Sequence, residues 1–371
     1  MKFYCKQQDI LNEIVYSMDF TQQRSSLSIL SNIYLETRNN ILIIKATDNA
    51  AGFSTQIPVE TKEEGNTTVY GEKFLEILRL LPSDANIMFE TKDRIMTITP
   101  EGSNIKFNST LRVIDGAEFP MMETTGDVQF FSIGQSSFIG MADQTIFSVS
   151  NDMNRAYLCG LYLEKTPVGM NLVATDGRRL SIVERKFSEQ IPDFKPIIIP
   201  TKFFTELKKL STGEGTFDLC IKDNVIFAKI GNRFFYSTLI KGQFPDYRRV
   251  IPQTQTSHCL VNIKDMVDAI KRVSVAIESK VCKLYILISK DELTLYSEEN
   301  ELGEANEKIP CQYEGDDCTI SLNYQYVLAP LKVMEGEKFT LNFTVPSRAL
   351  TLCPEGEHDY FHLVMPMQPN S

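Results

Sequence analysis

The sequence predicts an α+β fold of three similar domains, each made of two helices packed on antiparallel sheets. Two observations predict this fold. The chain repeats itself at a period of roughly 125 residues, which indicates an architecture built from copies of one unit. Within each repeat, segments that alternate apolar and polar residues surround two stretches with apolar residues at helical spacing. Such a chain is typical of a scaffold built by quasi-symmetry rather than of one catalytic core.

Matching sequence features mark the repeat. Asp48, at the end of a strand-like segment, returns as Asp176 in the same setting. An amphipathic stretch beginning at Gly71 returns at Pro200 and, more loosely, at Leu322. The repeats close on Asp115–Pro120, Lys241–Tyr247 and Val364–Met367. We therefore expect domains at residues 1–125, 126–254 and 255–371, with polar linkers near Met121–Gly126 and Ile251–Ser257.

The first repeat predicts most of its elements directly. A helix is expected near Asp9–Met18, and a second from the spacing of Phe74, Ile77, Leu78 and Leu81, which Pro82 ends. The polar residues Glu60–Asn66 are expected to connect two strands. Strands are expected at Met1–Cys5, Ile33–Arg38, Ile41–Thr47, Ala51–Pro58, Thr67–Tyr70, Ala85–Thr91, Arg94–Thr99 and Asn104–Ser109.

The second and third repeats follow the same plan. Helices are expected near Ser136–Val149 and Thr201–Leu210, and much of the second sheet at Asn171–Val183 and Phe217–Ile240. Two helical stripes mark the third repeat: Met266, Ala269, Ile270 and Val273, then Tyr324, Val327, Leu328 and Leu331. The chain thus predicts six similar half-domains.

The composition limits the class of protein. With 43% hydrophobic and 23% charged residues the chain is globular, and its net charge of −10 argues against coating nucleic acid over the whole surface. A local basic surface stays open. Eight cysteines without a C-x-x-C pair predict reduced thiols. No apolar run of about 18 residues and no signal peptide are seen, so a cytoplasmic protein without a membrane partner is expected.

Three stretches in this order, on a threefold repeat, carry a family resemblance: Ala174–Leu180, Phe244–Val250 and Val364–Met367. Over its whole length the chain resembles the bacterial β sliding clamp, the processivity subunit of DNA polymerase III. Arg24–Asn32 is also similar, although Ser28 stands where a proline is common. The tail Gln368–Ser371 departs from the arginine and leucine that are common there.

The resemblance implies a DNA clamp fold, in which each chain forms half of a closed ring. The ring would be a head-to-tail homodimer that encircles duplex DNA independently of sequence, with helices lining the hole. It implies no catalytic residues, no metal and no cofactor. The implied partners are the DNA polymerase III alpha subunit, the clamp loader and other proteins with a clamp-binding motif, met on the nucleoid in the cytoplasm.

The resemblance also implies three groups of site residues. A peptide-binding pocket between the second and third domains would use Leu158, Thr175, Gly177, Arg178, Leu180, Pro245, Arg249, Val250, Val345, Ser347, Leu363, Val364, Met365, Pro366 and Met367. DNA contacts are expected from Arg24, Arg155, Tyr157, Lys202 and Lys209. The dimer interface would include Lys73, Ile77, Arg79, Asn108, Val275, Ala276 and Glu304.

Other interpretations of the same residues remain. Asp48 and Asp176 could be catalytic, but an Asp of this kind is more often a turn former whose carboxylate bonds nearby amides. His358 and His362 have the spacing of a zinc peptidase, which would make the protein a metal-dependent hydrolase. Their stretch favours a strand, however, on which such residues lie about 13 Å apart. A third interpretation is a sheet-rich scaffold without a DNA partner.

Overall fold

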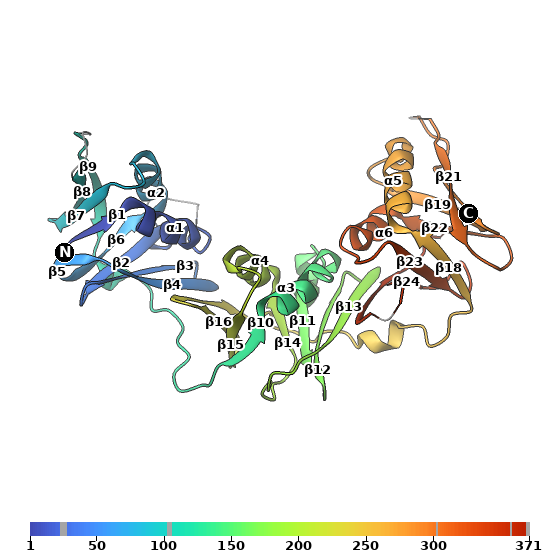
Figure 1. Ribbon diagram of the computed structural model, residues 1–371, viewed down its shortest axis with the longest axis horizontal. Helices are drawn as coiled ribbons and strands as arrows, with labels where there is room; N and C mark the ends of the chain where they lie inside the picture. The colour runs from blue at the N-terminus through green and yellow to red at the C-terminus, as the bar shows by residue number, and fades with distance from the viewer. Residues whose placement is uncertain (23–27, 102–105, 302, 357, 369–371) are drawn as a thin grey trace. The chain divides into compact units, whose positions relative to one another are not determined.

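The computed structural model describes residues 1–22, 28–101, 106–301, 303–356 and 358–368 (Figure 1). Contacts divide the chain into two compact units, one of residues 1–135 and 205–239, the other of residues 136–204 and 240–371. Each unit contains one continuous antiparallel sheet. The domain boundaries near residues 125 and 254 are a different division of the chain, and they stay a prediction.

The first unit is built on a sheet of thirteen strands. They are β1 (Lys2–Lys6), β2 (Asn32–Arg38), β3 (Ile41–Thr47), β4 (Ala51–Pro58), β5 (Glu60–Glu63), β6 (Gly65–Tyr70), β7 (Asn86–Lys92), β8 (Ile95–Glu101), β9 (Ser109–Ile114), β10 (Phe131–Gly134), β15 (Thr216–Lys222), β16 (Val225–Ile230) and β17 (Arg233–Thr238). Their order in the sheet is β10-β15-β16-β17-β4-β3-β2-β6-β9-β8-β7-β1-β5. The pairing of β17 with β4 therefore joins the middle of the sequence to its beginning.

The second unit is built on a sheet of twelve strands. They are β11 (Gly160–Lys165), β12 (Gly169–Thr175), β13 (Arg179–Lys186), β14 (Ile197–Pro200), β18 (Ser257–Asn262), β19 (Lys283–Ser289), β20 (Glu292–Tyr296), β21 (Asn306–Gln312), β22 (Cys318–Asn323), β23 (Lys338–Phe343), β24 (Leu350–Pro354) and β25 (Tyr360–Val364). Their order is β14-β11-β12-β13-β25-β24-β23-β18-β21-β20-β19-β22. Here the pairing of β13 with β25 joins the middle of the sequence to its last strand.

The helices match the expected apolar stripes. They are α1 (Gln7–Met18), α2 (Gly71–Leu80), α3 (Gln135–Asp143), α4 (Thr201–Leu210), α5 (Ile263–Val273) and α6 (Tyr324–Leu331). In Figure 1, α1 and α2 lie side by side on the strands of the first repeat. In α5 the four stripe residues Met266, Ala269, Ile270 and Val273 are all buried, and Asn262 caps the helix by accepting from Asp265 N at 3.1 Å.

The core of the first repeat lies between its two helices and the sheet. The ring of Phe89 lies 4.8 Å from that of Phe3 on β1 and 5.9 Å from that of Phe74 on α2. All three side chains are fully buried. Because an aromatic side chain gains several kcal/mol on burial, these contacts hold helix and strands together.

Three element predictions are wrong in detail. The polar stretch after Pro58 contains the strand β5, which pairs with β1 at the edge of the sheet and so needs no alternating pattern. The strand expected at Asn104–Ser109 begins only at Ser109, and residues 102–105 lie outside the described ranges. Helix α3 ends at Asp143 instead of Val149, where Thr145 Oγ1 donates to Met141 O at 2.8 Å.

Candidate functional site

The second sheet carries the candidate site where β13 pairs with β25, which we call the second junction. Leu180 lies opposite Leu363 in this pairing. Beyond β25 the chain stays attached, because Met365 N donates to Arg178 O at 2.9 Å and Met367 N to Ser321 O at 2.8 Å. The hydroxyl of Ser321 also donates to Met367 O at 2.6 Å. Met365 is thus fixed beside the β12–β13 turn, and Met367 beside β22.

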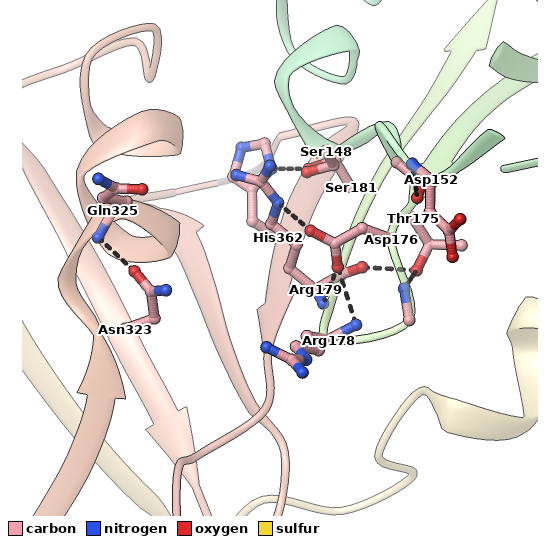
Figure 2. A network of polar contacts seen from close by, with 12 residues as sticks. Ser148, Asp152, Thr175, Asp176, Arg178, Arg179, Ser181, Asn323, Gln325 and His362 are labelled. Carbon is pink, nitrogen blue, oxygen red and sulfur yellow. Dashed lines mark hydrogen bonds and ion pairs between the residues drawn. The ribbon is translucent and has the colours of Figure 1, made fainter. Parts of the chain in front are cut away.

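That turn is held by a carboxylate, as expected for a turn former. Asp176 Oδ1 accepts from the backbone N of Arg178 at 2.8 Å and of Arg179 at 3.2 Å (Figure 2). Its Oδ2 pairs with Arg179 Nε at 2.9 Å. Gly177 has φ of +92°, a conformation that glycine adopts without strain. The turn prediction for Asp176 is confirmed, and that for Asp48 also, since its Oδ1 accepts from two backbone amides.

A buried apolar cluster forms a floor beside the turn. Its members are Leu158, Val173, Leu180, Ile182, Ile198, Phe244, Tyr247 and Leu363. Ala349 packs against the same cluster from the loop that leads into β24. The floor therefore combines residues from β11–β14, the chain after β17, and the two last strands. The long-range pairing of β13 with β25 brings the last strands to the floor. A hydrogen bond from Ile240 N to Ile198 O holds the chain after β17 beside β14.

The predicted pocket residues differ in how far they are buried. Leu158, Thr175, Leu180, Leu363 and Val364 are buried. Pro366 and Met367 are half-buried, while Gly177, Arg178, Pro245, Arg249, Val250, Val345, Ser347 and Met365 are exposed. Three of the exposed side chains are large and apolar: Val250 is 52% exposed, Val345 41% and Met365 42%. Buried floor and exposed apolar rim together are typical of a binding surface.

A tyrosine that sequence reasoning did not single out anchors one side of the floor. Tyr247 in the 3-10 helix Tyr247–Val250 donates to Glu164 and accepts from Asn171 Nδ2 at 3.2 Å. Arg248 forms an ion pair with the same Glu164 carboxylate. Burial, and then the hydrogen bond to Glu164, raises the pKa of Tyr247, so its hydroxyl stays protonated. Neighbouring Arg249 is left 82% exposed beside Asp246, with its guanidinium on the rim.

Arg155 lies at this turn. A Cβ added to Gly177 would be 3.2 Å from Arg155 Nη1, which places the guanidinium over the turn backbone. Arg155 Nε also pairs with Asp152 Oδ2 at 3.0 Å. Tyr157, two residues on, is half-buried against the floor cluster, with its Cβ close over Gly242. No pattern in the sequence indicates this placement, because the backbone kinks at Arg155 (φ −115°, ψ 53°).

The remaining residues predicted for DNA binding are scattered over the structure. Arg24 lies outside the described residues. Lys202 is half-buried in the first turn of α4. Lys209, in the last turn, forms ion pairs with Asp19 at 2.9 Å and Glu206 at 3.2 Å. The charge of Lys209 is therefore partly neutralised by its own chain.

The residues predicted for the dimer interface lie on α2, near β9, and around the end of α5. Lys73 pairs with Glu76 at 2.7 Å, Ile77 is partly buried, and Arg79 and Asn108 are exposed. Val275 is 80% exposed, while Ala276 is buried and its carbonyl accepts from Asn300. Glu304 is exposed just before β21. Glu307, on β21, forms an ion pair with Arg272.

The two histidines of the hydrolase hypothesis have unrelated surroundings. His362 is 1% exposed on β25, and its Nδ1 is 2.9 Å from Ser181 Oγ, which in turn lies 2.6 Å from Ser148 Oγ (Figure 2). Burial lowers the pKa of His362 to about 3, so the imidazole is neutral. His358 is exposed, and its Nε2 lies 2.7 Å from Glu355 O. Within the described ranges, no group of three His, Cys, Asp or Glu residues could hold a metal.

All eight cysteines are free, in agreement with the expected reduced thiols. Over the part of the chain that the structure covers, no helix is both long and apolar enough to cross a membrane. A repeated α+β scaffold with an apolar floor and a mixed rim is typical of proteins that bind other molecules.

Comparisons with known proteins agree with this class. Three family profiles of the DNA polymerase III beta subunit match in order: the N-terminal domain at residues 1–123, the central domain at 132–246 and the C-terminal domain at 248–368. The beta sliding clamp of Treponema pallidum (strain Nichols) is 34% identical over 372 residues, covering 99% of this chain and 100% of the relative. That of Escherichia coli (strain K12) is 27% identical over 370 residues, with the same coverage.

The fold agrees with solved structures as well. The crystal structure of the DNA polymerase III subunit beta from Pseudomonas aeruginosa has a TM-score of 0.93 and 25% identity, covering 99% of this chain and 100% of that one. The chain therefore belongs to the DNA polymerase III beta subunit family, the beta sliding clamps. It is a non-catalytic processivity subunit, which as a homodimeric ring encircles duplex DNA and tethers the polymerase. The hydrolase and the scaffold without a DNA partner are thereby wrong.

Proposed function

We propose that this clamp takes its partner proteins at the second junction, through the pocket residues named above. The observation that supports the proposal is that Val250, Val345 and Met365 are exposed apolar side chains on segments that also contribute residues to the buried floor. Such a surface exposes apolar area to water until a ligand covers it. Met365 suits a site with several ligands, because an unbranched thioether adapts its shape. The partners would be met on nucleoid DNA in the cytoplasm.

The size of this surface sets the affinity. A short peptide that buries about 350 Å² of apolar area gains about 9 kcal/mol at ~25 cal/mol per Å². Ordering the peptide and losing its translational freedom consume several kcal/mol of that gain. The remainder corresponds to a micromolar dissociation constant. Arg178, Arg249 and Arg155 surround the surface and would meet the polar ends of the peptide.

The test is fluorescence anisotropy of a labelled glutamine- and leucine-rich peptide on the intact protein. Met365→Asp should weaken binding at least about tenfold, because the peptide would bury an unpaired carboxylate. Val168→Asp is the matched control, since Val168 is 54% exposed between β11 and β12, outside the pocket residues, and the variant should bind as wild type does. Equal affinity for wild type and Met365→Asp would sink the assignment.

We also propose where the ring closes. Among the described residues, Ser109–Arg112 of β9 pair only with β8, and Asn306–Pro310 of β21 pair only with β20. Each strand thus offers an open edge, and a head-to-tail dimer would cover both by pairing β9 of one protomer with β21 of its partner. The exposed Val275 would be buried beside this pairing, with Lys73, Ile77 and Arg79 facing acidic Glu304.

Sedimentation velocity at micromolar concentration tests this interface. Val275→Asp should give folded monomers, because the new carboxylate would be buried without a partner. Val281→Asp, 45% exposed outside the proposed contact, is the control and should stay dimeric. A dimeric Val275→Asp protein would show that the interface lies elsewhere.

The DNA contacts are proposed to come from Arg24, Lys202 and Lys209, with Arg155 and Tyr157 at the edge of the peptide surface. Retention on DNA should be topological: the ring should stay on circular duplex and slide off linear duplex. Each lysine-to-alanine change that removes a phosphate contact should reduce the salt slope of binding by roughly one unit. Tight, salt-insensitive binding to linear duplex would contradict this proposal.

A further inference from the structure

The first sheet has its own junction, where β4 pairs with β17, and a cavity of about 380 Å³ lies beside it. Its lining residues come from β2–β4, from the chain after β9 and from β17. They include Tyr34, Lys45, Ser54, Phe119, Met122 and Phe234. The volume lies within the range of small-ligand and side-chain pockets. All lining residues belong to one compact unit.

This first junction repeats the second one in register. Phe234 lies opposite Ser54 on β17 and β4, just as Phe361 lies opposite Ile182 on β25 and β13. Tyr34 and Phe119 have ring centroids 5.3 Å apart, and Tyr162 and Phe244 have theirs 4.6 Å apart. The internal repeat thus places the cavity over the same face of the sheet as the floor of the peptide surface.

Two substitutions within the repeat explain why the first junction is hollow. Tyr247, two residues after Pro245, fills the space over the second sheet, and Met122, two residues after Pro120, holds the equivalent position in the first. Met122 is smaller and half-buried, with its Cε close to Gly52. Ser54 then takes the place of the larger Ile182, so the floor is lower as well.

The third difference gives the cavity a charge. Lys45 occupies the position of Val173, and its Nζ lies 5.2 Å from the centroid of the Tyr34 ring. Within the described residues Lys45 has no ion pair; Glu123 lines the cavity without reaching it. An ammonium group held over an aromatic face, on an otherwise largely apolar lining, is complementary to a carboxylate that arrives with an apolar group.

We infer that this cavity is a second peptide-binding site, whose ligand is an acidic peptide with one large apolar side chain. The apolar side chain enters between Phe119, Met122 and Phe234, and a neighbouring carboxylate pairs with Lys45. Met121, 99% exposed on the rim, covers the ligand from outside. The site differs in selectivity from the peptide surface of the second junction, whose floor carries valine where this one carries lysine.

Methyl resonances of methionine test this inference on the intact dimer. The chain has 13 methionines, and Met121 and Met122 report on the cavity while Met365 and Met367 report on the second junction. The signals are assigned from Met→Leu variants of protein labelled with [13C]methyl methionine. The probe is acetyl-glycyl-aspartyl-phenylalanyl-aspartyl-glycine amide, and its twin carries asparagine in place of both aspartates.

The acidic probe should shift the Met121 and Met122 signals saturably, and the asparagine twin should bind about fivefold more weakly. Lys45→Gln should lose this preference, and Lys45→Arg should keep it, which separates charge from folding. The inference is overturned if no saturable shift occurs, if only Met365 and Met367 respond, or if Lys45→Gln keeps the preference. Shifts that depend on protein concentration without probe would also overturn it, because a second copy would then be the occupant.

Discussion

The two strand junctions have the same backbone register. On the face turned away from the cavity and the floor, however, the first carries aromatic side chains and the second carries polar ones. In the first, Phe53 lies opposite Phe235, and Phe20 packs on both, with ring centroids 5.4 and 6.0 Å away. In the second, the corresponding residues are Ser181 and His362, joined to Ser148 by short hydrogen bonds (Figure 2). Three phenylalanines and a Ser–Ser–His chain thus fill equivalent positions.

The strand pairing is common to both junctions, while the side chains around it differ. The same backbone pairing forms at both junctions, although the side chains behind it are aromatic in one and polar in the other. The polar version has a cost: a buried imidazole needs partners, and His362 Nε2 has none among the described residues. The opposite face of each sheet, which carries the cavity in the first and the floor in the second, differs as well. Tyr236 lies over Gly52 in the first junction, whereas Leu363 lies opposite Leu180 in the second.

The largest expected effect on stability comes from giving the first junction the leucine that the second junction has at the equivalent position. Gly52→Leu should destabilise the protein by about 3 kcal/mol, because the Tyr236 ring already occupies the space over Gly52. Adding Tyr236→Leu should recover part of this loss, although Tyr236→Leu alone leaves a cavity and costs about 2 kcal/mol. Urea unfolding followed by circular dichroism measures all three variants. Additive losses in the double variant would mean that the two positions do not share one space.

The polar buried face predicts a pH dependence that the aromatic one lacks. Burial lowers the pKa of His362 to about 3, below its value of ~6.5 in unfolded chains. The unfolded state therefore binds more protons between these values, so stability is full above pH ~6.5 and falls as pH decreases. From pH 6.5 to 5, wild type should lose about 1.5 kcal/mol more than His362→Gln.

Urea unfolding at a series of pH values provides the measurement. His258→Gln is the control, because it also removes one imidazole, but from an exposed position. If His362→Gln showed the same slope as wild type, the imidazole would not be the group that titrates on unfolding.

The smallest expected effect concerns two equivalent glutamates, Glu164 and Glu36, each of which accepts a hydrogen bond from a tyrosine hydroxyl. Glu164 is 7% exposed and accepts from Asn171, Tyr247 and Arg248. Its counterpart Glu36 is half-buried and accepts from Tyr34 at 3.0 Å. Glu164→Gln should cost about 1 kcal/mol more than Glu36→Gln, because more charged hydrogen bonds are lost. Thermal unfolding of both variants checks this, and equal shifts in melting temperature would contradict it.

Local elements could be predicted well from the sequence. The stripe of α5 and the hairpin strands β2–β4 follow from residues that are close in the sequence, where spacing alone decides burial. Strand β5 could not be predicted, because an exposed edge strand carries no alternating pattern. The end of α3 depends on a threonine hydroxyl that bonds the preceding carbonyls, which propensity does not reveal.

The candidate site could be predicted only through the family resemblance. Its floor depends on the pairing of Leu180 with Leu363, which are far apart in the sequence, and no local pattern specifies that register. The anchoring of Tyr247 by Glu164 was missed for the same reason. Arg155 reaches Gly177 through a kinked backbone, so its type and spacing give no indication of its place.

We expect the partner peptide to bind at the second junction and not at its repeat. The most direct test is the methionine methyl spectrum of the dimer during titration with a glutamine- and leucine-rich peptide. We expect the Met365 and Met367 signals to shift and saturate at micromolar concentrations, while the Met121 and Met122 signals stay in place. Shifts of Met121 and Met122 with Met365 and Met367 unmoved would contradict it.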